Sequence, residues 1–277
     1  MSGGATETTK SIVDIHDESG PLDVTREFGV LQAGLQKMFD QITAVLPVEP
    51  DPSTDEFAAY GVEGGPKGSL NAFVGPEVDW MIHSWIGNPS IGFTNLHLTA
   101  YLGPHTYVPH LGIAVGTIPD YWYFVDYVPR VDLLARPDYL DRYYEPHNAE
   151  FMAIREDPNF SPFVSQTLYV RQAVSNTALC CVVKRTDDAV DKMLRLAQGR
   201  VDAWLDHLKV GDPVPSGERG SLAERDLLVR RTVADRDPAN VIGVRFFGEE
   251  MTERLVRALW GGDRRIARPD GSKARIG

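Results

Sequence analysis

The spacing of apolar residues divides the chain into helical and strand-like blocks. Between residues 24 and 46 apolar side chains recur every three or four positions, which is the spacing of an amphipathic helix. The same period returns over residues 187–210, and two further helices are expected at about 218–233 and 249–260. The longer insert at 130–160 is expected to hold one or two more helices.

Between residues 68 and 184 the pattern changes to short runs rich in β-branched and aromatic residues, separated by Gly, Pro and Asn. Such runs are typical of β-strands. The connections before residue 128 are too short for crossover helices, so neighbouring strands should pair antiparallel. The seven predicted strands are 69–74, 78–86, 92–102, 110–118, 121–128, 166–174 and 178–184.

A helix, then an antiparallel sheet, then more helices is an α+β arrangement. Helices on both faces would bury the sheet, so we expect a three-layer α/β/α sandwich with a central, mostly antiparallel sheet of about seven strands. Residues 21–262 should form a single domain, between a polar, flexible N-terminus at 1–20 and a basic, flexible tail at 263–277. The longest apolar run, 178–183, is far shorter than the roughly 20 residues of a membrane-spanning helix.

The charge of the chain limits its partners. With 28 basic and 39 acidic residues the net charge is −11, which makes nucleic acid an unfavourable partner. The segment 264–275 instead carries five basic residues and one acid, either as a solvated terminus or as a docking patch for an acidic protein. Adjacent cysteines at 180 and 181 fit a reducing compartment, and MSGGATETTK has no apolar signal region, so a cytoplasmic protein is expected.

Common catalytic signatures are absent: GxGxxG after a strand, GxxxxGK[ST], HExxH, GxSxG and paired CxxC. No histidine spacing indicates a metal site, so none is expected. Alternation places Asn95 and His97 on one face of a strand, and His110, Gly112 and Ala114 on one face of the next. The small residues there would leave room for a flat ligand, or would allow a helix to pack tightly.

Two charged residues have both a structural and a functional interpretation. Asp237 precedes a proline in VADRDPANV, which is typical of a turn or cap residue. Arg171 lies within a predicted strand, where it would face solvent or, if it pointed inward, would need an anion such as a substrate carboxylate. Residues alone do not decide between these alternatives.

Several segments, in order over roughly residues 60–260, resemble red chlorophyll catabolite reductase, a relative of the ferredoxin-dependent bilin reductases. The most specific are PDYLDRYY, VRQAVSNTA and FGEE. The full set is SWI at 84–86, Asn95 in TNLHLT, Pro109, PRVDLLARPDYLDRYY at 129–144, PFVS at 162–165, LYVRQAVSNTA at 168–178, RR at 230–231, Asp237 and RFFGEE at 245–250.

The resemblance implies an enzyme with an antiparallel sheet between helices and with no bound metal or flavin. It implies that reduced ferredoxin supplies electrons one at a time, that the protein supplies protons to a linear tetrapyrrole, and that the chain forms a homodimer. The family's plastid transit peptide has no counterpart in the sequence, which agrees with the cytoplasmic expectation.

The resemblance also assigns site residues. Of two pocket acids in plant members, one falls on Asp237 and the other on Ala114, where an alanine cannot transfer a proton. We therefore expect Asp237 as proton donor and His97 as a second proton-handling group, with His110 as another candidate beside Ala114. Asn95 would contact the ligand. Substrate carboxylates or carbonyls would be held by Arg171 and Ser175.

The departure at Ala114 leaves two other functions open. The same fold could catalyse a redox step on a substrate that is not a tetrapyrrole. It could also bind or carry a tetrapyrrole without reducing it.

Overall fold

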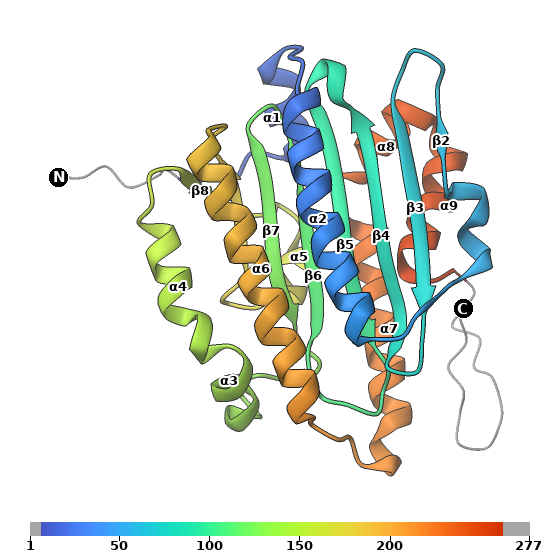
Figure 1. The fold of residues 1–277 in the computed structure, drawn as a ribbon, viewed down its shortest axis with the longest axis vertical. Helices are drawn as coiled ribbons and strands as arrows, with labels where there is room; N and C mark the ends of the chain where they lie inside the picture. Colours follow the sequence, from blue (N-terminus) through green and yellow to red (C-terminus); the bar gives the residue numbers. More distant parts are fainter. Residues whose placement is uncertain (1–6, 263–277) are drawn as a thin grey trace.

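The computed structural model describes residues 7–262 and shows three layers around one sheet (Figure 1). Helices α2 and α6 cross the front of the sheet, and α7, α8 and α9 lie behind it. The expected α+β sandwich with a mostly antiparallel sheet is confirmed. The helices are α1 (Ile12–Ser19), α2 (Thr25–Val45), α3 (Pro137–Tyr143), α4 (Glu145–Arg155), α5 (Leu168–Ala173), α6 (Asp187–Val210), α7 (Arg219–Arg236), α8 (Asn240–Phe247) and α9 (Glu249–Trp260).

The sheet has nine strands, and every pairing between them is antiparallel. Along the sheet the order is β1-β3-β4-β5-β6-β7-β9-β8, and β2 pairs with β3. The strands are β1 (Glu49–Pro50), β2 (Tyr60–Gly61), β3 (Lys67–Val74), β4 (Val78–Asn88), β5 (Phe93–Leu102), β6 (His110–Thr117), β7 (Tyr121–Val128), β8 (Phe160–Pro162) and β9 (Leu179–Val183).

One predicted strand is wrong. Residues 166–174 do not extend the sheet, and Leu168–Ala173 forms helix α5 instead. The reason lies in the sheet itself: β9 already pairs with β7 along one edge and with β8 along the other. No edge of β9 remains for the predicted strand, and the segment forms helix α5, none of whose residues is buried and which contacts α7.

The two ends of the chain differ in what the structure describes. Within the segment 1–20, residues 12–19 form α1, in which Ile12 is buried and Ser11 and Asp14 make a capping box. The flexibility expected of 1–20 stays a prediction. The basic tail expected at 263–277 lies outside the described residues.

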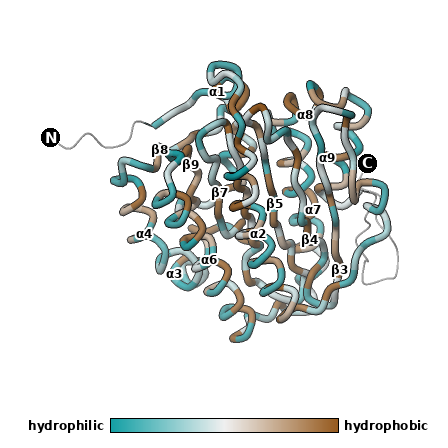
Figure 2. The backbone as a smooth tube through the Cα atoms, turned by 45° about the horizontal axis from the view of Figure 1, so that its top comes forward, coloured by the Kyte–Doolittle hydropathy of each residue, from teal (hydrophilic) through white to brown (hydrophobic). Residues whose placement is uncertain are grey.

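The front face of the sheet holds the main core. Apolar residues at helical spacing on α2 (Leu31, Leu35, Met38 and Ile42) are all buried there. Figure 2 shows the alternation of hydrophilic and hydrophobic positions along α2 and α6 that this packing requires. Among residues 7–262, no helix is both long and apolar enough to cross a membrane.

Candidate functional site

A cross-strand row of four residues lies on the back face of the sheet, the side covered by α7 and α8. His97 of β5 pairs with Ala114 of β6, Ala114 with Phe124 of β7, and Phe124 with Cys180 of β9. We call these four residues the His97 row. Strands lie about 4.8 Å apart, so the row spans roughly 14 Å.

The His97 row is less covered than the front of the same strands. All four of its residues keep partial exposure. Their neighbours along the strands, such as Leu98, Ile113 and Tyr123, point to the front and are fully buried under α2 and α6. The back face is therefore less completely covered than the front at this row, which includes the small residue Ala114.

Asn95 lies one pair further along the same face and pairs with Gly116. Its Oδ1 atom is buried and has no hydrogen-bond partner among the described residues. Buried polar atoms in proteins are nearly always hydrogen-bonded. Asn95 Oδ1 is therefore available to accept an N–H group from a ligand bound over the row.

His97 provides an uncharged imidazole in this site. Burial lowers the pKa of His97 to about 4, so the ring is neutral near pH 7. Neither ring nitrogen forms a hydrogen bond with another described residue. A neutral imidazole can donate from one nitrogen and accept at the other, which suits proton transfer.

Asp237 approaches the opposite end of the His97 row. It ends α7, and its Oδ1 accepts a hydrogen bond of 2.9 Å from the Ala239 backbone N–H. Burial raises the pKa of Asp237. Burial also raises the pKa of the Cys180 thiol, and nearby Cys181, Asp126 and Asp237 raise it further, which places Asp237 near Cys180.

The small residues over the sheet have two different roles. A Cβ atom at Gly112 would lie 3.3 Å from Cε1 of Phe124, so the phenyl ring already fills that space. Ala114 is partly exposed between His97 and Phe124 and leaves open surface beside them. The methyl group of Ala114 cannot transfer a proton, as the sequence analysis noted.

His110 is almost fully buried and contacts other residues of the protein, so its expected role in the site stays a prediction. It lies on the predicted face but is only 2% exposed. Its Nδ1 accepts a 3.0 Å hydrogen bond from the Leu102 N–H, and its Nε2 lies 3.3 Å from Asp226 Oδ2 on α7. Burial lowers the pKa of His110 to about 4, so a neutral ring links β6 to α7.

Sequence reasoning missed the buried ion pair beside His110. Arg130 is 1% exposed, and its Nε and Nη2 donate to Asp226 Oδ2 at 2.9 and 2.7 Å. Its guanidinium also donates to the carbonyl oxygens of Gly103 and Thr106. This cluster fastens α7, the helix that ends at Asp237, to the loop between β5 and β6.

Arg171 is exposed on α5 and does not point into the sheet. Its Nη1 donates to the carbonyl oxygen of Ser165 at 2.8 Å. The expectation of an inward-facing arginine depended on a strand at 166–174, and that strand does not exist. A contact between Arg171 and substrate carboxylates stays a prediction.

Ser175 is buried and bonded to a carboxyl that sequence reasoning also missed. Its backbone N–H and its hydroxyl donate to the two oxygens of Asp126 at 2.7 and 2.5 Å. Asp126 is the single acid within the apolar strand YWYFVDYV, which is the signal that could have identified it. Burial raises the pKa of Asp126 to about 7.

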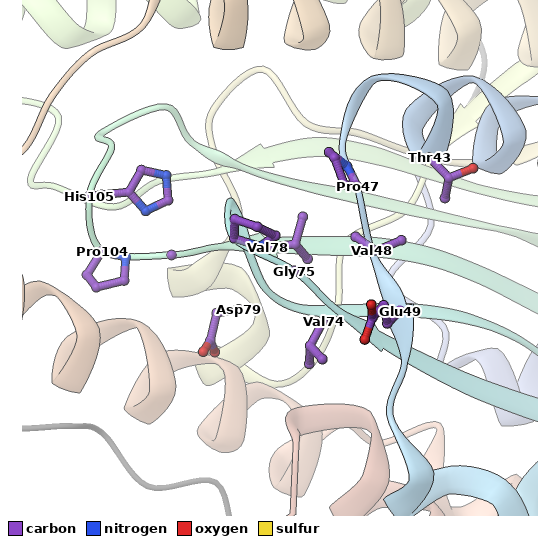
Figure 3. Close-up of a pocket in the computed structure, with 12 residues that line it drawn as sticks. Thr43, Pro47, Val48, Glu49, Val74, Gly75, Val78, Asp79, Pro104 and His105 are labelled. Atoms are coloured by element: carbon purple, nitrogen blue, oxygen red, sulfur yellow. The ribbon is translucent and has the colours of Figure 1, made fainter.

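A separate groove of about 760 Å³ lies at the other end of the sheet (Figure 3). It is bounded by the end of α2, the turn between β3 and β4, and the loop that contains His105. None of the four residues of the His97 row lines it. No cluster of three or more His, Cys, Asp or Glu side chains with the arrangement of a metal site occurs in the described part of the chain.

The comparison with known sequences agrees with the resemblance noted above. Residues 35–260 match the family model described as red chlorophyll catabolite reductase (RCC reductase). Red chlorophyll catabolite reductase 1 of rice, a chloroplastic protein, is 26% identical over 235 residues, which cover 78% of this chain and 70% of the rice protein. The chloroplastic red chlorophyll catabolite reductase of Arabidopsis thaliana is 26% identical over 226 residues, covering 76% and 68%.

These relatives contradict the expected localisation. Both the rice and the Arabidopsis proteins are chloroplastic, so the expectation of a cytoplasmic protein is wrong. That expectation depended on the adjacent cysteines at 180 and 181 and on the composition of the first residues.

The comparison with solved structures supports the fold. The structure of tomato phytochromobilin synthase in complex with biliverdin matches with a TM-score of 0.71 over 86% of this chain and 89% of the tomato chain. The sequences are 13% identical, so this likeness concerns the arrangement of sheet and helices.

Proposed function

The chain belongs to the red chlorophyll catabolite reductase family, and we propose that it reduces a linear tetrapyrrole bound between the sheet and helices α7 and α8. The observation that carries the proposal is the His97 row. It is a partly exposed strip on the back of the sheet, whose front is fully buried under α2 and α6 at the same strands, with a neutral imidazole at one end and Asp237 near the other. The relatives act on, or are bound to, pigments of this chemical class, as their names state.

The chemistry of a conjugated tetrapyrrole suits these residues. The flat pigment would lie over Ala114 and against the ring of Phe124, with a pyrrole N–H donated to Asn95 Oδ1. Reduction of one double bond takes up two electrons and two protons. Asp237 would donate one proton, since burial favours its protonated form, and His97 would pass on a proton at the other end of the row.

The electron donor in this proposal is reduced ferredoxin, an external one-electron iron–sulfur protein. An acidic donor needs a basic docking surface. The segment 264–275, with five basic residues, is the proposed surface. Replacing these five residues with glutamine should lower ferredoxin-dependent turnover and flatten its dependence on salt. Turnover with a small chemical reductant serves as the control and should not change.

A homodimer is a further part of the proposal that follows from the family. Light scattering on a size-exclusion column tests it through the mass in solution, which would be twice 30.7 kDa.

Pigment binding is the direct test of the proposed site. Biliverdin and red chlorophyll catabolite should each shift their absorption bands when mixed with the protein. Asn95→Ala should weaken this binding, because it removes the acceptor at Oδ1. Asn148→Ala, at an exposed position of α4, is the matched control. Equal binding by both variants would contradict the site.

A further inference from the structure

A fully buried carboxyl lies on the same face as the His97 row. Asp126 of β7 pairs with Gly112 of β6, two positions from the pair between Phe124 and Ala114. Side chains two residues apart on a strand share a face, and diagonal cross-strand neighbours lie about 7–8 Å apart. Asp126 is thus a diagonal neighbour of Ala114 and borders the proposed site.

The direct partners of Asp126 are uncharged. Its two oxygens accept from the N–H and the hydroxyl of Ser175, and it forms no ion pair within the described residues. Arg200 on α6 is a charged group that acts on Asp126, but its guanidinium pairs with Glu150 at 2.9 Å. Asp226, by contrast, contacts a buried arginine directly.

This environment favours the protonated acid. Burial raises the pKa of Asp126 to about 7, and the hydrogen bonds from Ser175 and the charge of Arg200 offset only part of that effect. The other titratable groups that interact with Asp126 are Tyr127, Tyr144 and Cys180, and burial raises the pKa of all three. Near neutral pH, then, Asp126 is the group in this cluster that exchanges a proton.

Ser175 is positioned to accept the proton of Asp126 and to pass a proton on. Its hydroxyl contacts Asp126 Oδ1 at 2.5 Å, accepts from the Thr177 N–H at 3.2 Å, and lies 3.2 Å from Thr177 Oγ1. A hydroxyl both donates and accepts, so it can take one proton while it releases another. Ser175 is 6% exposed as a residue and Asp126 is 0% exposed, so Ser175 is the less completely buried of the two residues.

We propose that Asp126 stores a proton for the reduction and that Ser175 passes it into the site over the His97 row. This inference rests on the proposed function and deepens it. The reduction of one double bond takes up two electrons, delivered one at a time, and two protons, of which Asp237 supplies one. For the other, protonated Asp126 donates from Oδ1 to Ser175 Oγ across their 2.5 Å contact, and Ser175 passes its own hydroxyl proton on towards His97, which delivers it to the substrate. Asp126 is left as a carboxylate and regains a proton from solvent before the next turnover. Asp126 acts through Ser175 and is a positioning residue.

Two measurements test the proposal with the full chain. In the ligand-free protein, infrared spectroscopy should show a carboxylic acid band that disappears as pH rises through about 7. The band should be missing in Asp126→Asn. Turnover of biliverdin and of red chlorophyll catabolite with reduced ferredoxin should fall over the same pH range in the wild type. Asp126→Asn should be slower by about 100-fold and should lose that pH dependence.

Variants of Ser175 separate proton transfer from a structural role. Ser175→Ala keeps the acid but removes the hydroxyl, so it should keep the infrared band and lose turnover. Ser175→Thr restores a hydroxyl and should recover most of the rate. A structural role alone would lower the melting temperature of each variant and leave the pH profile unchanged.

The outcomes distinguish this proposal from the function on which it rests. No titrating band in the wild type, or an unchanged pH profile in an active Asp126→Asn variant, would overturn the role of Asp126 alone. A wild type that turns over neither pigment would overturn the proposed function and, with it, the transfer step, whatever the infrared result.

Discussion

Arg130 and Asp226 form a buried ion pair in which two guanidinium nitrogens donate to one carboxylate oxygen, at 2.9 and 2.7 Å. The pair joins residues 96 positions apart in the sequence. Because Asp226 belongs to α7, it sets the position of the helix that ends at Asp237. A stability feature thereby also places the proposed proton donor.

Removing the carboxylate from this pair should destabilise the folded protein. Asp226→Asn leaves the charge of Arg130 buried without an anion, and the free energy of unfolding should fall by about 3–5 kcal/mol. Urea unfolding monitored by circular dichroism measures this loss. Asp138→Asn breaks an exposed ion pair with Arg136 and is the control, with stability expected to stay the same. Equal effects of the two variants would contradict a buried ion pair.

Stability should depend on pH through His110. Burial lowers its pKa from 6.5 to about 4 in the folded state, so between these values the unfolded chain binds more protons. The contribution is fully present above pH 6.5 and is lost as pH falls towards 4, by about 3 kcal/mol. His110→Asn keeps an acceptor for the Leu102 N–H and should weaken this pH dependence in urea unfolding.

The pH range over which Asp226 changes the stability of the fold lies below that of His110. Burial alone would raise its pKa, but the contacts with His110 and Arg130 lower it to about 2. Its contribution is present above pH 3.8 and is lost as pH falls towards 2. A loss of stability that begins only below pH 4 would contradict the assignment to His110.

Asp237 should control turnover rather than folding. Asp237→Asn keeps an acceptor for the Ala239 N–H, so pigment binding and melting temperature should be preserved. Turnover should fall by about 100-fold or more, because the amide cannot donate the proton that the reduction needs. Single-turnover absorbance measures this rate. Asp235→Asn, an exposed acid on the same helix, should react like the wild type.

The wild-type rate should also fall as pH rises through the raised pKa of Asp237, since only the protonated acid can donate. A normal rate in Asp237→Asn would remove this residue from the mechanism.

Two glycines of β6 offer a matched pair of substitutions. A Cβ atom at Gly112 would press on the flexible ring of Phe124 at 3.3 Å, whereas one at Gly116 would lie 2.0 Å from the Thr94 carbonyl oxygen. Gly116→Ala must separate two strands and should cost about 1–3 kcal/mol or more. Gly112→Ala should fold normally but bind pigment about tenfold more weakly, since the ring moves towards the ligand. Thermal melting and absorbance titration report the two effects, and unchanged binding by Gly112→Ala would show that Phe124 does not touch the pigment.

Regular hydrophobic patterns were sufficient to predict much of the fold. The strands β3 to β7 are rich in β-branched and aromatic residues and pair in sequence order, and α2 and α6 keep a clear helical period, so local patterns and short connections determine them. The segment 166–174 failed for a non-local reason, because β7 and β8 occupy both edges of β9. The sequence LYVRQA itself does not indicate that both edges of β9 are already paired.

The candidate site, too, could be predicted from the sequence only in part. Alternation correctly placed Asn95 and His97 on one face of one strand and Ala114 on one face of the next, but the register that pairs His97 with Ala114 appears only in the structure. Alternation could not show that α7 covers His110 while it leaves Ala114 partly exposed, because that depends on where Asp226 meets Arg130. The partnership of Asp126 with Ser175 joins residues 49 positions apart and appears only in three dimensions.

The central claim is that the site over the His97 row reduces a linear tetrapyrrole. Anaerobic absorbance of the full-length protein with red chlorophyll catabolite, and separately with biliverdin, before and after addition of reduced ferredoxin, tests it most directly. The account predicts a band shift on mixing and loss of the pigment band only after the reductant is added. A shift that persists unchanged would indicate a pigment carrier, and no shift with either pigment would indicate a different substrate; both results would contradict the claim.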